Sequence, residues 1–267
     1  MASFAVCWDG SHTNVSQRIP VLALALTLVS GSALAEPSAA GVHGARTSRL
    51  DGKHFTAEVE MTIERDGKRE DRRLLVWRDD PAGRGERILA KFLAPADLKD
   101  FGLLFLENRG RPNDYFVHQP ELRRVRRVSE TVVSQDIYGV DLEFLGFGVA
   151  QSVETEPDAL ADEVVEGRRA WRLTEHATET TPRFDERISW IDPETSVPLR
   201  TEHRKAGKAV LIARVLKLES VDGVPTPVES VFERPGVGER VHMRVRKIDY
   251  ETPIAPDFFS TLALIKR

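Results

Sequence analysis

Cysteine is almost absent from this chain, and its absence excludes several kinds of chemistry. The only cysteine, Cys7, lies ahead of an apolar run at residues 19–35, so it cannot be a lipidated cysteine, which must follow such a run. The rest of the chain therefore offers no disulfide, no thiol nucleophile and no thiolate metal ligand. We expect the fold to be held by its apolar core and its backbone hydrogen bonds.

A marked excess of one charge is also lacking. Lys and Arg together number 38 against 42 Asp and Glu, which gives a net charge of −4. A nucleic-acid-binding domain is typically strongly basic. The composition therefore predicts no nucleic-acid partner.

Long apolar runs are lacking apart from residues 19–35, which follow Arg18 and end in Ala33-Leu34-Ala35. A membrane-spanning helix needs ~20 apolar residues, whereas a basic residue, a short apolar core and a small-x-small site are typical of a cleaved secretory signal. We expect residues 1–35 to be a signal peptide, with Val15 as an alternative start that would make residues 1–14 a mis-assigned extension. The exported chain would lie in the periplasm, with a flexible leader at 36–50 and a single domain at 51–267.

Motifs for catalysis and metal binding are lacking as well. The sequence has no Gly-x-Ser-x-Gly elbow, and its histidines show no close HxH or HxxxH pairing. A zinc site needs three or four converging ligands. We expect no catalytic residue, no cofactor and no metal, and hence a protein that is not an enzyme.

Alternation of apolar and polar residues is what the chain has in abundance. Residues 55–63 alternate strictly, Asp66-Gly67 follows as a hairpin turn, and similar turns stand at Glu166-Gly167 and Asp222-Gly223. This rhythm predicts about ten or eleven antiparallel strands and few helices, with residues 154–162 as a short helix or a loop and residues 136–147 undecided between helix and strand. We expect a mainly β, curved antiparallel half-barrel, whose concave face is filled by side chains, covered by short helices or occupied by a ligand.

A strip of arginines precedes Val128. Arg123, Arg124, Arg126 and Arg127 would place at least two guanidiniums beside apolar side chains if the segment were a strand. One interpretation is a solvated edge strand that is protected by charge. The other is a contact for phosphate headgroups or an acidic partner, because arginine binds both in bidentate fashion.

Several segments, taken in order, resemble the LolA-like family of exported proteins, in its branch of outer-membrane lipoprotein-sorting proteins. The matching residues run from Phe92-Leu93-Ala94-Pro95 through Gly102, Phe105-Leu106-Glu107-Asn108 and Tyr115-Phe116-Val117 to Trp190-Ile191-Asp192-Pro193. The resemblance implies a half-barrel whose concave side is covered by helices and receives acyl chains. This chain departs from the smaller carriers of the family by lacking a clear long helix before its first strand.

Two functions follow as expectations. The first is a non-enzymatic carrier or receptor for lipid or for lipoprotein acyl chains, and the second is an envelope-stress or transporter accessory protein that senses lipid with the same fold. Either would contact an inner- or outer-membrane partner. We expect the ligand to meet apolar side chains of the strands, namely Val59, Met61, Ile63, Trp77, Phe92, Trp171, Trp190 and Phe232.

Overall fold

The computed structural model describes residue 5 and residues 37–50, 52–81, 84–108, 110–129, 145, 153–178 and 183–266. All of these except residue 5 belong to one compact unit. The expected signal peptide lies outside the described residues, apart from residue 5. No helix within these ranges is long and apolar enough to cross a membrane.

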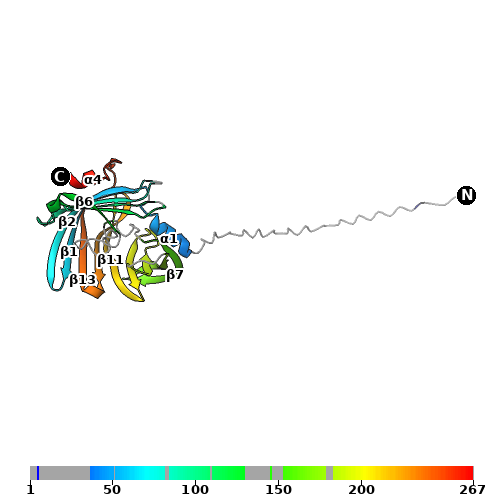
Figure 1. The fold of residues 1–267 in the computed structure, drawn as a ribbon. Coiled ribbons are helices and arrows are strands. Elements are labelled where there is room, and N and C mark those ends of the chain that lie inside the picture. The colour runs from blue at the N-terminus through cyan, green and yellow to red at the C-terminus, as the bar shows by residue number, and fades with distance from the viewer. Residues whose placement is uncertain are drawn as a thin grey trace. The chain divides into compact units, whose positions relative to one another are not determined.

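The unit consists of one open antiparallel sheet of 13 strands (Figure 1). Their order across the sheet is β6-β5-β4-β3-β2-β1-β13-β12-β11-β10-β9-β8-β7. The strands are β1 (His54–Arg65), β2 (Lys68–Asp79), β3 (Arg87–Ala94), β4 (Gly102–Leu106), β5 (Asp114–Gln119), β6 (Arg124–Val128), β7 (Thr155–Val165), β8 (Arg168–Ala177), β9 (Glu186–Ile191), β10 (Pro198–Lys205), β11 (Lys208–Val221), β12 (Val224–Arg234) and β13 (Glu239–Asp249). The mainly β, antiparallel architecture expected from the sequence is confirmed.

Local sequence explains the hairpins that connect neighbouring strands. In β1 buried and less buried residues alternate along nearly the whole strand. At the predicted turn after it, Asp66 has φ of 52° and Gly67 has φ of 72°, as a type I′ turn requires. The turns at Glu166-Gly167 and Asp222-Gly223 repeat this pair of positive φ angles. All three predicted turns are therefore confirmed.

The strand count is higher than the about ten or eleven strands expected from the turn rhythm. The difference lies at the two edges of the sheet, where the arginine strip forms β6 and residues 155–165 form β7. For residues 154–162 the sequence predicts a short helix or a loop, whereas the structure has β7 there. Both edge strands carry many charged residues, so the alternation that marks a half-buried strand is weak in them.

Helices are few and short among the described residues. They are α1 (Ala39–Thr47), the 3-10 turns η1 (Pro120–Leu122) and η2 (Pro235–Val237), and α4 (Thr261–Ile265). The helix α1 occupies the segment expected as a flexible leader, and the Ser38 side chain caps it by accepting a hydrogen bond from the Gly41 amide. Its composition, with two glycines and several small residues, gives little helical periodicity, which explains why the sequence did not predict it.

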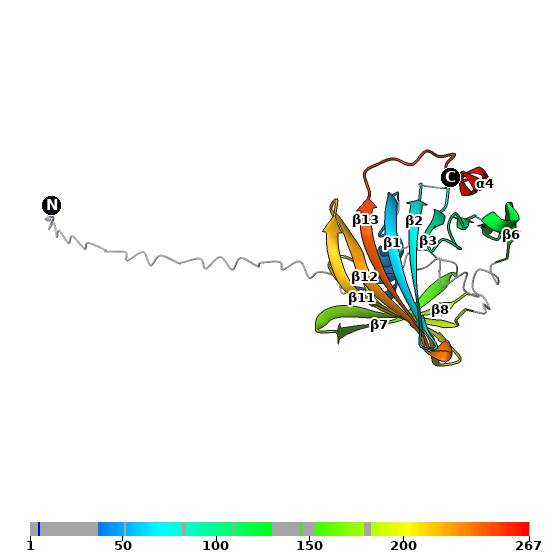
Figure 2. The same cartoon turned by 90° about the vertical axis from the view of Figure 1, so that its left-hand side faces the viewer.

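The sheet bends around the face that carries Val59, Met61 and Ile63, which we call the concave face (Figure 2). The opposite, convex face is covered at β3 and β4 by the C-terminal segment, where Leu264 of α4 and Phe259 pack on Leu89 and Leu104. Gly102 permits this close packing, because a Cβ atom at that position would lie 2.8 Å from the Cδ2 atom of Leu264. The C-terminal segment thus covers part of the convex face.

Candidate functional site

The concave face is apolar over β1 to β5 and over β11 to β13, a region that we call the apolar half. Its side chains form the largest buried cluster of the domain, and Val59 is only 1% exposed. Leu145, the one described residue between 130 and 152, is buried in the same cluster. Members of the cluster include Phe55, Val59, Met61, Ile63, Leu74, Val76, Ala90, Phe92, Phe105, Tyr115, Leu211, Phe232, Val241 and Met243.

The eight apolar residues predicted to meet a ligand fall into three groups. Five of them share the main concave cluster, namely Val59, Met61, Ile63, Phe92 and Phe232. Trp171 lies on the same face but belongs to a smaller cluster with Val42 of α1, Leu173 and Ile191.

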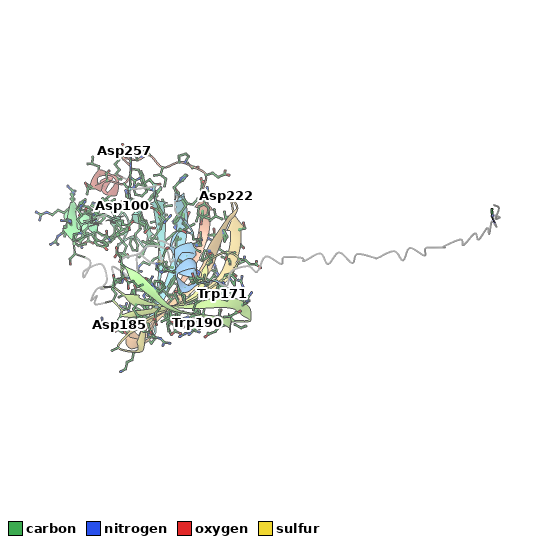
Figure 3. All side chains as sticks on the ribbon, turned by 90° about the vertical axis from the view of Figure 1, so that its right-hand side faces the viewer. Asp100, Trp171, Asp185, Trp190, Asp222 and Asp257 are labelled. Atoms are coloured by element: carbon green, nitrogen blue, oxygen red, sulfur yellow. The ribbon has the colours of Figure 1, made fainter. Side chains whose placement is uncertain are left out.

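Trp77 and Trp190 lie on the convex face. Trp77 packs against Phe258, with ring centroids 5.1 Å apart, and Trp190 donates a hydrogen bond to Glu163 at 2.9 Å. Trp171 and Trp190 stand on neighbouring strands β8 and β9 (Figure 3). The register pairs Trp171 with Ile191 and Arg172 with Trp190, which places the two indoles on opposite faces. Period-two alternation predicts which residues of one strand share a face, but not which face this is relative to other strands.

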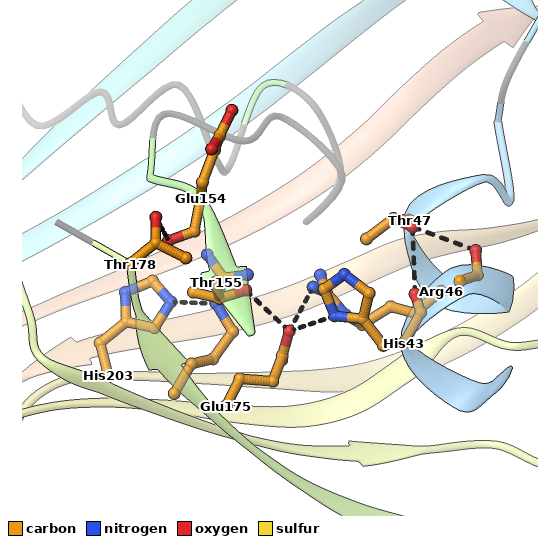
Figure 4. A network of polar contacts seen from close by, with 10 residues as sticks. His43, Arg46, Thr47, Glu154, Thr155, Glu175, Thr178 and His203 are labelled. Atoms are coloured by element: carbon orange, nitrogen blue, oxygen red, sulfur yellow. Dashed lines mark hydrogen bonds and ion pairs between the residues drawn. The ribbon is translucent and has the colours of Figure 1, made fainter. Parts of the chain in front are cut away.

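Over β7 to β10 the concave face also carries buried polar side chains, beside the small apolar cluster of Trp171, Leu173 and Ile191. The carboxylate of Glu175 on β8 accepts three hydrogen bonds at its Oε1 atom (Figure 4). The bond with the His43 ring is 2.8 Å, that from the Arg46 guanidinium is 2.9 Å and that from the Thr155 hydroxyl is 2.8 Å. Because His43 and Arg46 both belong to α1, Glu175 fixes this helix to the sheet.

A second buried arginine lies on the adjacent strand. Arg187 of β9 donates from Nε to the Nε2 atom of His203 at 3.2 Å. The ring of Phe184 stacks on His203 with centroids 4.2 Å apart, and the Arg187 guanidinium lies 5.0 Å from the centroid of the same ring. Ser189, two residues farther along β9, is equally buried. We call His43, Arg46, Thr155, Glu175, Arg187, Ser189 and His203 together the polar cluster.

The apolar half and the polar cluster share one face, as the strand register shows. Residues directly opposite each other in antiparallel strands point to the same side of the sheet. One continuous row of such pairs crosses eight strands, through Ile63, Val241, Phe232, Ala213, Thr201, Ser189, Leu173 and Leu160. The concave face is therefore amphiphilic: it is apolar over β1 and β11 to β13, and from β10 to β7 it carries both polar and apolar side chains.

The charge state of Glu175 follows from its surroundings. Burial alone raises the pKa of this carboxyl, but the positive charges of Arg46 and Arg187 and the hydrogen bonds from Thr155 and His43 outweigh burial and hold the pKa below its ordinary value. Glu175 is therefore an anion at neutral pH. The polar cluster thus contains fixed charges in a buried environment.

The sequence does not predict the polar cluster. No two histidines are close in sequence, whereas His43 and His203 approach the same face from α1 and β10. The available signal was Glu175. This acidic residue lies two positions after Leu173 in an alternating strand, so its side chain points to the same buried face.

The predicted arginine strip lies at an edge of the sheet. Arg124, Arg126 and Arg127 belong to β6, whose only neighbour among the described strands is β5, and Arg123 caps η1 in the left-handed conformation. All four side chains are exposed, and Arg127 pairs with Asp114. The edge-strand interpretation is confirmed, and a role in contacting a partner stays a prediction.

The described residues contain no group of three or more histidine, cysteine or acidic side chains that could hold a metal ion. The polar cluster itself combines one carboxylate with two guanidiniums. Such a set is suited to holding a polar group by hydrogen bonds and charge.

Solved structures with this fold include three that cover nearly the whole domain. A domain described as an outer-membrane lipoprotein-sorting protein from Vibrio parahaemolyticus is 18% identical with a TM-score of 0.76, covering 84% of this chain and 97% of that one. A DUF1329 family protein from Desulfovibrio piger is 21% identical with a TM-score of 0.76, covering 85% and 99%. A LolA superfamily protein from Nitrosomonas europaea is 15% identical with a TM-score of 0.66, covering 85% and 99%.

These similarities establish the fold, and the family rests on a separate comparison. No curated protein matches the chain. A family model described as "-like: Uncharacterized protein" matches residues 84–266, which is more than half of the chain. The domain therefore has the LolA-like fold that the sequence resemblance predicted, and the chain belongs to the family that this model describes.

Proposed function

We propose that this protein is a non-enzymatic periplasmic carrier or receptor for lipid or for lipoprotein acyl chains, acting in outer-membrane lipoprotein or lipid trafficking. The observation that carries the proposal is the large apolar half of the concave face in a LolA-like sheet. Burial of acyl methylenes on such a face contributes ~0.8 kcal/mol each, which gives a multi-chain lipid substantial affinity. The relatives named for lipoprotein sorting and for the LolA superfamily share this fold.

The apolar half offers a direct test by substitution. Ala90 lies in the middle of it, 1% exposed, and Ala90→Trp adds a bulky side chain where acyl chains would lie. We expect the variant to stay folded and to lose most of its uptake of a fluorescent fatty acid. Val164→Trp is the matched control, because Val164 is 71% exposed on β7, and it should leave uptake unchanged.

The opposite outcome is equally well defined. If the apolar half is only a packed core, Ala90→Trp overpacks it and lowers the free energy of unfolding by ~1–3 kcal/mol. Strong destabilisation by Ala90→Trp, together with no probe binding by the parent protein, would refute the carrier function. Mass spectrometry of the natively purified full chain identifies the ligand itself. Co-purified phospholipid or acylated peptide supports a carrier.

A second candidate function is a lipid-sensing accessory protein that contacts a membrane partner. The exposed arginines of β6 favour it, because the side chains of Arg124 and Arg126 make no hydrogen bond or ion pair with the described residues and stand at the edge of the described sheet. A stoichiometric protein that co-purifies with the parent chain and is lost from the double variant Arg124→Ala, Arg126→Ala would support this function. Co-purification unaffected by the two substitutions would exclude the strip as the contact.

A further inference from the structure

The polar cluster contains hydrogen-bonding atoms that are buried without partners. Arg187 is 2% exposed and Ser189 is 1% exposed, yet the Nη1 atom of Arg187 and the hydroxyl of Ser189 meet no hydrogen-bond partner among the described residues. They are two positions apart on β9 and point to the same face. Buried donors are normally paired, because leaving them unpaired is costly in free energy.

The charge of Arg187 acts on the carboxylate of Glu175, its register partner on β8, without forming an ion pair with it. The Oε1 atom of Glu175 is engaged by α1 and Thr155, and its Oε2 atom is buried without a hydrogen-bond partner among the described residues. No ion pair joins Arg187 to a carboxylate in the described part of the chain, and its contacts are the neutral ring of Phe184 and the imidazole of His203. An oxygen acceptor with negative charge would satisfy both Arg187 and Ser189.

The position of these two residues relates them to the apolar half. Arg187 pairs with His203 across β9 and β10, and His203 pairs with Leu211 across β10 and β11. Leu211 belongs to the main apolar cluster. A molecule with a polar end at Arg187 would therefore have its apolar part directed along the same face onto that cluster.

We propose that Arg187 and Ser189 bind the anionic oxygen end, a carboxylate or a phosphate, of an acyl lipid whose chains lie on the apolar half. This inference rests on the proposed function, because it assigns the polar end of the same ligand. It gives the bound lipid one orientation, with its head under α1 and its chains toward β1 and β13.

Two probes of equal chain length test the proposal. Oleate carries a carboxylate and oleyl alcohol does not, so the parent protein should bind oleate about tenfold more tightly or better, as a charge-assisted contact predicts. Arg187→Gln should abolish this preference and leave the affinity for oleyl alcohol unchanged, whereas Arg187→Lys should retain part of it. Arg172→Gln is the matched control, because Arg172 lies on the adjacent strand β8 and points to the convex face.

The outcomes separate this inference from the proposed function. Binding of neither probe by the parent overturns the carrier function itself. Binding of both probes equally, with no effect of Arg187→Gln, keeps the carrier and overturns the head site, which would then hold a buried water. If inorganic phosphate or acetate displaces oleate at the same concentration at which that anion binds the lipid-free protein, the site binds a free anion and the proposed orientation is wrong. Ser189→Ala, which removes one small donor, gives the same test in a variant expected to fold.

Discussion

Two buried arginines, Arg78 and Arg187, show how differently one fold can use the same side chain. Both are 2% exposed. Arg78 donates from Nε to Glu86 at 2.5 Å, from Nη1 to the carbonyl oxygens of Leu50 and Lys53 at 3.1 and 3.2 Å, and from Nη2 to Asp80 at 3.4 Å. The side chain of Arg187 makes a single hydrogen bond within the described part of the chain, to His203.

The difference separates a structural group from a candidate binding group. Each nitrogen of Arg78 has a partner, so this guanidinium ties the segment before β1 to β2 and has no remaining capacity for a ligand. Arg187 keeps a buried nitrogen without a partner among the described residues. Removal of Arg78 should therefore cost stability, whereas removal of Arg187 should cost recognition.

The largest expected effect comes from Arg78→Leu. This change leaves the buried carboxylate of Glu86 unpaired and removes two hydrogen bonds to backbone carbonyls, so we expect a loss of ~3–5 kcal/mol in the free energy of unfolding. Urea denaturation followed by circular dichroism measures it. A loss no greater than that of Arg187→Gln would remove the distinction between the two arginines.

A smaller effect is expected for Arg187→Gln, which breaks only one hydrogen bond. The loss should be about 1 kcal/mol, measured in the same urea titration. A loss as large as that of Arg78→Leu would show that Arg187 is structural and would weaken its assignment to a ligand.

Two of the buried glutamates, Glu175 and Glu86, should differ in the sign of their pH dependence. The pKa of Glu175 is lowered in the folded state, so its contribution to stability is present above the ordinary carboxyl pKa of about 4.3 and is lost as the pH falls through the lower, folded value. Glu175→Gln should therefore be most destabilised relative to the parent near neutral pH, and the two should converge in acid. Thermal melts between acid and neutral pH measure this convergence, and a constant difference would contradict it.

For Glu86 the expected sign is reversed. Burial raises the pKa of this carboxyl, and the positive charge of Arg78 only partly offsets the effect. The folded state thus favours the protonated form, and its stability declines as the pH rises above about 4.3 toward the folded pKa. Glu86→Gln should remove that part of the decline. The same thermal melts provide the check, and a steeper decline in the variant would oppose it.

The smallest effect on the free energy of unfolding is expected at a residue that contacts neither Arg78 nor Arg187. Val164 is 71% exposed on the edge strand β7, so Val164→Ala should change the free energy of unfolding by no more than about 0.5 kcal/mol. This variant sets the baseline against which the two arginines are compared. A larger change would indicate that the β7 edge is covered in solution.

Local chemistry was predictable from the sequence and long-range assembly was not. The turn at Asp66-Gly67 was predictable because a type I′ turn itself demands positive φ at both residues. The alternation of β1 identified Val59, Met61 and Ile63 as one buried row. Trp77 was misplaced among them because the facing of β2 depends on its register with β1.

The polar cluster was beyond sequence analysis for a related reason. His43 and Glu175 meet only because α1 returns to β8 from a distant part of the chain. Neither residue stands in a motif, and the small, glycine-containing sequence of α1 has weak helical periodicity. Spacing along the chain carries no information about such a contact.

The order of the strands has a consequence for how the chain folds. β1 pairs with β13, so the first and last strands of the sheet are neighbours at its centre, as in the pairing of Met61 with Met243. Without β13 the remaining strands would form two separate groups of six, β1 to β6 and β7 to β12. The pairing of β1 with β13 closes a very long loop, and the closure of such a loop slows folding. Each half can pair its hairpins while the chain is being made, but the continuous concave face exists only after the last strand has been inserted.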